Sequence, residues 1–212
     1  DITMGAIATG NAVMGDTEAY NKLRGYIARN DMGNDFLFDG LDQMVDLEEY
    51  RNLYIAQIYL SNIDMWLNQK YWRERENFGK WRWIIYDTDI SLGQHDYYYY
   101  TQNYETASSF NTVDFATINY GGPSWPHYQP WFSEKIISLL DNESFRDDFI
   151  QTFAVHLNTT FKTQRVLAKI DSLAKNISKE MPYQIGRYGG VTVGFNPYGT
   201  HFTTMEEWQS HV

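Results

Sequence analysis

Acidic and amide side chains that could bind a metal ion are concentrated between residues 62 and 93. Asp64 and Asn68 follow a helical pattern of apolar residues, and Asp87 and Asp89 follow a short strand-like run. Carboxylate and amide oxygens are the ligands that Mg²⁺, Mn²⁺ and Ca²⁺ prefer. Asp87 and Asp89 are two residues apart, so their side chains face the same side of an extended chain. Two carboxylates stay ionised in a tight cleft only beside a cation or an arginine, so the motif predicts a metal site.

Each part of this motif also has an interpretation without catalytic chemistry. An Asp-x-Asp sequence after a strand is often a solvated turn or a helix cap, and Asp64 by itself could be a loop or cap residue. Trp81 and Trp83 alternate along the strand, a pattern typical of core and rim packing. Trp81 could instead be a platform on which a nucleobase stacks. The combination of carboxylates and an amide after two separate elements carries more weight than either part.

The elements that must position these residues are mainly helices. Asp46 is suited to be an N-cap, and the apolar positions after it predict a largely buried helix that ends near residues 61–62. Residues 70–73 and 81–86 predict a hairpin that leads directly into Asp87. Further helices are expected over residues 17–30, 131–140, 145–157 and 163–179. Thr163 is expected to cap the last of these. A capping box of Thr203 or Thr204 with Glu207 predicts one more helix near the end of the sequence.

Four segments lack such patterns and are expected to be irregular: residues 1–15, 31–45, 91–127 and 182–202. The third is longer than an ordinary connection, and its many aromatic residues argue against disorder, so we expect a functional loop there. The chain as a whole predicts a mostly helical α+β fold in a single domain spanning residues 1–212.

The composition excludes several classes of chemistry. The chain has 212 residues and no cysteine, which excludes disulfides, thiolate catalysis and cysteine-ligated metal sites. Its formal net charge of -10 repels phosphate backbones, so no nucleic-acid partner is expected. No apolar run approaches the roughly 20 residues of a membrane-spanning helix. The chain starts Asp-Ile-Thr-Met without a signal peptide, so we expect a processed chain or a piece of a longer one.

Three sequence blocks around the acidic residues resemble the CotH family of spore-coat-H-like atypical protein kinases. The helical run at residues 50–64 ends in Asn-Ile-Asp, an asparagine follows at residue 68, and residues 79–93 read GKWRWIIYDTDISLG. The family pattern has an Asn-x-Asp after a helix, an asparagine shortly after, and a tryptophan-containing strand that ends in Asp-x-Asp. Flanking segments at residues 15–32, 132–161 and 205–208 also resemble the family, so the likeness covers nearly the whole chain.

The resemblance implies phosphoryl transfer from ATP to a protein serine or threonine hydroxyl, dependent on Mg²⁺ or Mn²⁺, on the large lobe of an atypical kinase-like fold. It implies that Asp64 occupies the catalytic position and that Asn68 and Asp87 hold the metal. Asp89 would be an accessory metal carboxylate. Trp81 is the candidate nucleotide-binding residue.

The chain departs from the usual kinase pattern in three ways. Asn62 and Ile63 precede Asp64, and three residues rather than four separate Asp64 from Asn68. Gln69 stands where the family often has a second asparagine. No Gly-rich phosphate loop and no Lys–Glu pair of the small lobe are visible in the sequence. We therefore expect these groups upstream of residue 1, and we expect this fragment alone to be inactive.

Two other functions stay open. A catalytically silent relative of the same fold would be a coat or surface interaction module, which the aromatic segment and the acidic charge would suit. Tyrosine and tryptophan faces with paired carboxylates would also suit a carbohydrate-binding or glycoside-processing domain, which needs no Mg²⁺-nucleotide. The kinase and coat interpretations both predict a protein partner, and the resemblance implies a secreted or cell-surface location.

Overall fold

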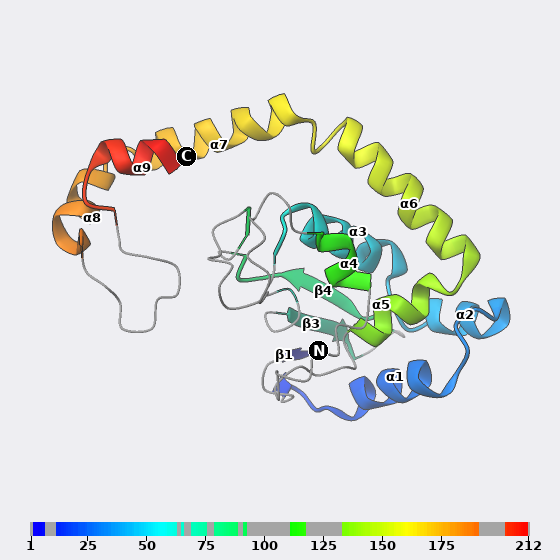
Figure 1. The fold of residues 1–212 in the computed structure, drawn as a ribbon. Helices are drawn as coiled ribbons and strands as arrows, with labels where there is room; N and C mark the ends of the chain where they lie inside the picture. Colours follow the sequence, from blue (N-terminus) through cyan, green and yellow to red (C-terminus); the bar gives the residue numbers. More distant parts are fainter. Residues whose placement is uncertain are drawn as a thin grey trace, which may run out of the picture. The chain divides into compact units, whose positions relative to one another are not determined.

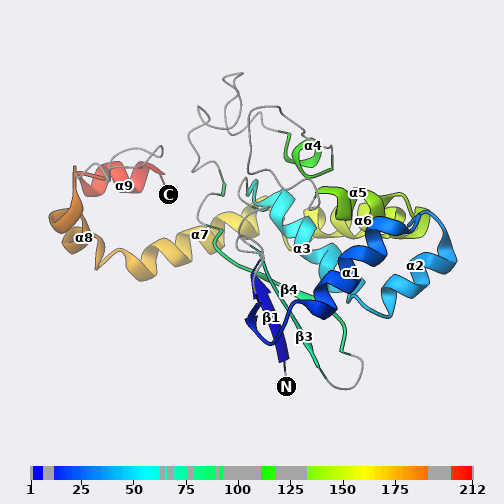
Figure 2. The same ribbon diagram turned by 90° about the horizontal axis from the view of Figure 1, so that it is seen from below.

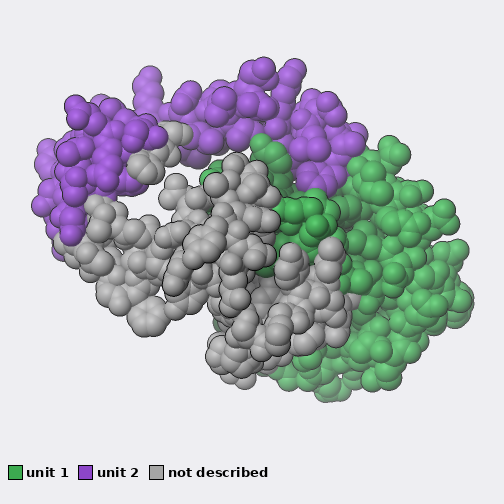
Figure 3. All heavy atoms as spheres, in the orientation of Figure 1, with its two compact units in different colours: residues 1–92, 109–152 green, residues 93–108, 153–212 purple. Residues whose placement is uncertain are grey.

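The computed structural model describes most of the chain in two compact units. Unit 1 comprises residues 1–92 and 109–152, and unit 2 comprises residues 93–108 and 153–212 (Figure 3). The predicted single domain stays a prediction, and each unit is described by itself. The described residues are 2–6, 12–62, 65, 69–75, 79–88, 91–92, 111–117, 133–190 and 202–211.

A four-stranded antiparallel sheet in unit 1 carries the predicted hairpin. The strands are β1 (Ile2–Ala6), β2 (Ala12–Met14), β3 (Gln69–Glu74) and β4 (Arg82–Ile85), in the order β2-β1-β3-β4. Figure 1 labels β1, β3 and β4. The pairing of β3 with β4 confirms the hairpin. The prediction that residues 1–15 are a loop is wrong, because β1 forms its ladder along β3, a partner more than sixty residues away in sequence.

The helices predicted around the hairpin are present in unit 1. They are α1 (Glu18–Arg29), α3 (Leu47–Tyr59), α5 (Ser133–Leu140) and α6 (Glu143–Asn158), which continues into unit 2. Asp46 caps α3 as predicted, because its Oδ1 accepts a hydrogen bond of 3.2 Å from the Glu49 backbone N–H. Helix α3 packs against β4 (Figure 2).

Two segments predicted to be irregular contain helices. Helix α2 (Asp35–Asp42) lies within residues 31–45, where the Asn34 side chain caps it by accepting from the Leu37 N–H at 3.3 Å. Helix α4 (Thr112–Thr117) lies within residues 91–127 and contacts α3 and α5. Both helices are short, with eight and six residues, and a helix of this length depends on caps and tertiary contacts for its stability.

The core of unit 1 lies between the hairpin and the helices. Tyr71 of β3 stacks on Tyr20 of α1 with ring centroids 3.8 Å apart, and Trp81 meets both rings edge-on. Trp83 of β4 contacts Tyr50 of α3 at 4.7 Å in the same way. These aromatic contacts fix the hairpin on α1 and α3, and they therefore fix the strand that leads to Asp87.

Unit 2 contains α7 (Thr163–Ile177), α8 (Met181–Tyr188) and α9 (Met205–His211). Lys162, not Thr163, occupies the N-cap position of α7. The predicted capping box of α9 is confirmed: Glu207 accepts from the Thr203 N–H at 2.8 Å, and the Glu207 N–H donates to Thr204 Oγ1 at 3.1 Å. The loop predicted over residues 182–202 is wrong where α8 lies, and residues 191–201 fall outside the described part of the chain.

Candidate functional site

The structure describes two of the five predicted site residues, Asp87 and Trp81. Asp64, Asn68 and Asp89 fall outside the described residues, so their roles stay predictions. Neighbouring residues on both sides of Asp64 and after Asp89 are described. The described residues therefore include parts of the backbone that hold the segments around Asp64 and Asp89.

Asp87 lies two residues after the end of β4, and its side chain is exposed. Its backbone is left-handed, with φ at 55°. Aspartate tolerates this conformation better than most residues, but it is still less favourable than extended or right-handed helical backbone. Backbone of this kind persists where the surrounding structure imposes it, and such positions are common at functional sites. The rigid hairpin thus presents a carboxylate to solvent on a constrained turn.

The last turn of α3 supports the segments on either side of the predicted site. Beyond the Asp-x-Asp motif, the Leu92 N–H donates to the Leu60 carbonyl at 2.7 Å. On the other side, Asn62 is fully buried and its Nδ2 donates to Gln57 Oε1 at 2.7 Å. Met65, the residue after Asp64, is also fully buried, and its N–H bonds the Asn62 carbonyl at 3.4 Å. One helix end therefore anchors the chain that flanks Asp64 and the chain that follows Asp89.

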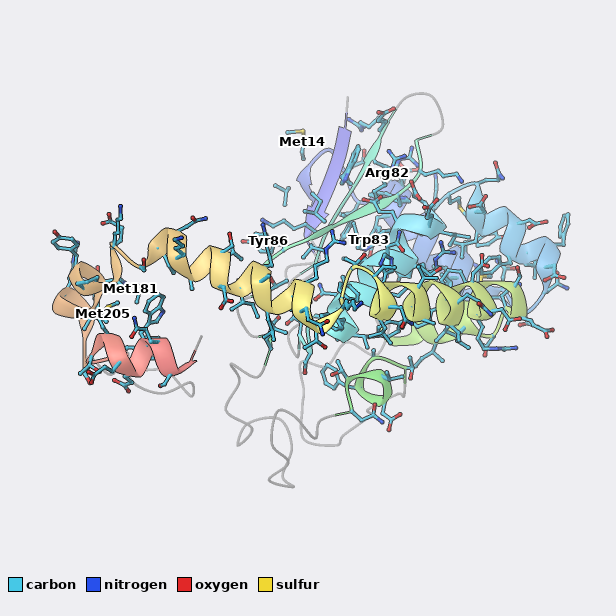
Figure 4. All side chains as sticks on the ribbon, turned by 90° about the horizontal axis from the view of Figure 1, so that it is seen from above. Met14, Arg82, Trp83, Tyr86, Met181 and Met205 are labelled. Atoms are coloured by element: carbon cyan, nitrogen blue, oxygen red, sulfur yellow. The ribbon has the colours of Figure 1, made fainter. Side chains whose placement is uncertain are left out.

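The hairpin has one buried face and one that is partly exposed. Tyr71 and Trp83 are cross-strand partners on the buried face. The period of two along a strand puts the alternate residues on the other face. Two cation–aromatic pairs lie there: Arg82 is 5.5 Å from the Trp72 ring, and Lys70 Nζ is 3.6 Å from the Tyr86 ring. Figure 4 labels Arg82, Trp83 and Tyr86 along this strand. The other strand residues on this face are Ile84 of β4 and Glu74 of β3.

Trp81 lies in the core rather than on an accessible surface. Only 1% of its surface is exposed, and its ring contacts Tyr20 and Tyr71. Its backbone is fixed as well, because the Trp81 N–H donates to the Met44 carbonyl and its carbonyl accepts from the Asp46 N–H. A ring in this position has no free face for a nucleobase, so core packing is the interpretation that its burial supports.

An ion pair joins the start of α3 to the start of β4. Arg82 Nε lies 3.0 Å from Asp46 Oδ2 and 3.5 Å from Glu49 Oε2. Burial by itself would raise the pKa of Asp46, but hydrogen bonds from the Glu49 N–H and from Arg82 outweigh it and lower that pKa overall. Burial, with the Asp46 charge nearby, raises the pKa of Glu49. The pair therefore connects the helix that precedes Asp64 to the strand that precedes Asp87.

No group of three or more His, Asp or Glu residues that could hold a metal occurs among the described residues. Three of the four predicted metal or catalytic residues are outside that set, so the metal prediction is untested. Asp87 fits a hard cation in its chemistry, since it offers an exposed carboxylate. The described part of the chain also has no helix long and apolar enough to cross a membrane.

Comparison with protein families identifies the family of this chain. A model described as CotH kinase protein matches residues 8–212. The chain belongs to this family. The resemblance inferred from the acidic motif is thus confirmed, and a kinase-like role follows for this CotH-family chain at the level of the family. Neither the curated proteins nor the solved structures gave a match.

Sequence reasoning missed two groups that the structure brings to the hairpin. Lys70 lies over Tyr86, the residue immediately before Asp87. The Arg82 side chain reaches Asp46. The alternation of Lys70, Trp72, Arg82 and Ile84 along two paired strands was a usable signal, because it puts cations and aromatic rings on one face of the predicted hairpin.

Proposed function

We propose that this CotH-family chain takes part in Mg²⁺-dependent phosphoryl transfer from ATP to protein serine or threonine hydroxyls. The observation that carries the proposal is Asp87, an exposed carboxylate on a constrained left-handed turn just after hairpin strand β4, which Trp83 fixes in the core. The family to which the chain belongs supports a kinase-like role in general.

The proposed roles follow from the demands of phosphoryl transfer, which needs positioning and charge neutralisation more than covalent help. Asp87 and the Asn68 amide would hold Mg²⁺ or Mn²⁺, and Asp89 would be an accessory ligand. Asp64 would orient the attacking hydroxyl and accept its proton. The metal ion, when bound, neutralises charge on the phosphate oxygens.

The structure supports this division of roles through the scaffold. Leu92 and Asn62 are tied to the same turn of α3, at Leu60 and Gln57 respectively. Asp89 is three residues from Leu92, and Asp64 is two residues from Asn62. Residues so close in sequence to a common anchor are restricted in how far apart they can move, since each residue extends the chain by at most about 3.6 Å. A shared anchor suits a site assembled from two loops.

Calorimetric titration of Mg²⁺-ATP tests the proposal. The samples are this chain and a longer chain that includes the upstream segment, where we expect the phosphate loop and the small-lobe lysine. Asp87→Asn removes the charge and keeps a side chain that tolerates left-handed backbone. Asp147→Asn, an exposed position of α6, is the matched control. We expect binding that Asp87→Asn abolishes and Asp147→Asn leaves unchanged.

The alternatives predict other results in the same titration. Absence of Mg²⁺-ATP binding by both chains would contradict the kinase proposal and favour the silent coat or surface module. Binding of oligosaccharides without any need for a metal would favour the carbohydrate interpretation. Binding of Mg²⁺-ATP that survives in Asp87→Asn would refute the metal role of Asp87.

A further inference from the structure

Lys70 holds its positive charge over the ring of Tyr86, the residue before Asp87, on the partly exposed face of the hairpin. Its Nζ lies 3.6 Å from the centre of the Tyr86 ring, and the Lys70 side chain is half-buried. Tyr86, labelled in Figure 4, directly precedes Asp87 and is 43% exposed. The ring thus holds an ammonium group beside the turn that carries the candidate metal ligand.

The geometry of the sheet explains why the two side chains meet. Lys70 and Ile84 are cross-strand partners in the β3–β4 ladder, so their side chains lie on the same face. Tyr86 is two residues beyond Ile84 and returns to that face. A diagonal neighbour at this separation is within reach of a long side chain and an aromatic ring. The contact is therefore built into the register of the hairpin.

Three of the neighbouring cations, unlike Lys70, have carboxylate partners, whereas Arg73 lies over the Trp81 ring at 5.6 Å. Arg82 pairs with Asp46 and Lys80 Nζ lies 3.1 Å from Asp42 Oδ1. Arg75 pairs with Asp16 at 2.6 Å. Among the residues that the structure describes, no carboxylate lies within ion-pair distance of Lys70, although the chain has 27 acidic and 17 basic side chains.

An aromatic ring and a carboxylate position a lysine with different consequences. A carboxylate neutralises the ammonium charge, whereas a ring face attracts the ammonium through its quadrupole and leaves the full charge in place. Lysine is a compact charge with three N–H donors, which suits contact with phosphate oxygens. The Asp87 carboxylate would repel a polyphosphate, and a cation held on the preceding residue's ring without a carboxylate partner offsets that repulsion.

We propose that Lys70, held by Tyr86, contacts the phosphate oxygens of the nucleotide whose metal ion is bound at Asp87. This inference rests on the proposed function and adds a phosphate-binding residue to it. The hairpin then supplies both a carboxylate for the cation and an ammonium for the anion of the same metal–phosphate group. The part of the nucleotide that Lys70 recognises is the phosphate chain and not the base.

Titrations with ligands of decreasing phosphate charge test the inference on the same two chains. The variants are Lys70→Met, which keeps the length and apolar character of the stem, and Lys80→Met, which removes a lysine of the same hairpin that is ion-paired elsewhere. The ligands are Mg²⁺-ATP, Mg²⁺-ADP, Mg²⁺-tripolyphosphate and adenosine. Thermal unfolding of each variant shows whether the fold is retained.

Lys70→Met is expected to weaken Mg²⁺-ATP and Mg²⁺-tripolyphosphate binding by about 10- to 100-fold, the range for a lost hydrogen bond to a charged group. The loss should be smaller for Mg²⁺-ADP and absent for adenosine, and Lys80→Met should leave all four affinities unchanged. Tyr86→Phe keeps the ring and should keep the affinity, whereas Tyr86→Leu removes the ring and should weaken the phosphate ligands only.

Failure of this inference is distinguishable from failure of the proposed function. If the parent chain binds Mg²⁺-ATP, Asp87→Asn abolishes binding and Lys70→Met does not weaken it, the role of Lys70 is refuted and the metal site stands. If neither Mg²⁺-ATP nor Mg²⁺-tripolyphosphate binds to either parent chain, both proposals fail. Equal weakening of adenosine and Mg²⁺-ATP by Lys70→Met would also overturn the inference, because it would show a general change of the surface.

Discussion

Asp46 stabilises the junction between α3 and β4 in two separable ways. Its Oδ1 caps α3 by accepting from the Glu49 N–H, and its Oδ2 pairs with Arg82 Nε at 3.0 Å. Asp46→Asn retains a good N-cap side chain and removes the charge. Asp46→Ala removes the charge and the cap hydrogen bond together. Comparing the two variants therefore separates the contribution of charge from that of capping.

The magnitudes follow from the exposure of the groups. The ion pair is partly exposed, so it is worth about 0.2–1 kcal/mol. The negative charge at the helix N-terminus adds about 0.3–1 kcal/mol. Asp46→Asn should thus cost roughly 0.5–2 kcal/mol of the free energy of unfolding. Asp46→Ala should cost about 0.5–2 kcal/mol more, the usual loss for a cap.

The charge contribution of Asp46 depends on pH with a defined sign. The pKa of Asp46 is lowered in the folded protein, because the hydrogen bonds from the Glu49 N–H and Arg82 outweigh the effect of burial. Its stabilisation is present above the carboxyl's unfolded pKa and is lost as the pH falls through the lower folded pKa. The raised pKa of Glu49 acts with the opposite sign; its contribution from burial remains in both variants, whereas the contribution of the Asp46 charge is lost in them.

Urea unfolding followed by near-ultraviolet circular dichroism at pH 7 and at pH 3 measures both effects. We expect the difference between wild type and Asp46→Asn to be largest at pH 7 and smaller at pH 3. In an Arg82→Met background, the same substitution should cost less at pH 7, because the ion pair is already absent. Equal losses for Asn and Ala, or a difference that grows in acid, would refute this account of the junction.

Two further substitutions test the core and the candidate turn. Trp81→Phe should lower the free energy of unfolding by roughly 0.5–3 kcal/mol and leave Mg²⁺-ATP affinity unchanged, because the ring is buried. Weaker binding in calorimetry with unchanged stability would instead support Trp81 as a nucleotide contact. Asp87→Gly should be about 1 kcal/mol more stable than Asp87→Ala in urea unfolding, because φ is 55° and glycine adopts it without strain. Greater stability of the alanine variant would show that the turn is not left-handed in solution.

The fold was predictable where local signals and the core agree. The Asp46 cap and the apolar positions after it define α3, and the aromatic run at 81–86 defines β4. Strands β1 and β2 were not predictable because they are short and are stabilised by pairing along β3. Asn34 at the start of α2 is typical of a helix N-cap, but the acidic residues and Gly40 that follow it favoured an irregular segment in the sequence analysis.

The candidate site was predictable in position and not in geometry. A strand followed by Asp-x-Asp places Asp87 at the end of a rigid element, as the structure describes. The left-handed backbone of Asp87 could not be predicted from the sequence, because no glycine marks that position. The contact of Lys70 with Tyr86 depends on the register of β3 against β4, which a shift of one residue would destroy.

Paramagnetic broadening by Mn²⁺-ATP tests most directly whether a metal–nucleotide complex binds at the end of β4. The probes are isoleucine methyl resonances in the folded chain, with and without the upstream segment. We predict the strongest broadening at the isoleucines close in sequence to the proposed ligands. These are Ile84 and Ile85, three and two residues before Asp87, and Ile63 and Ile90, next to Asp64 and Asp89. The broadening should be lost in Asp87→Asn. Strongest broadening at isoleucines other than these four, or none in either chain, would contradict the central claim.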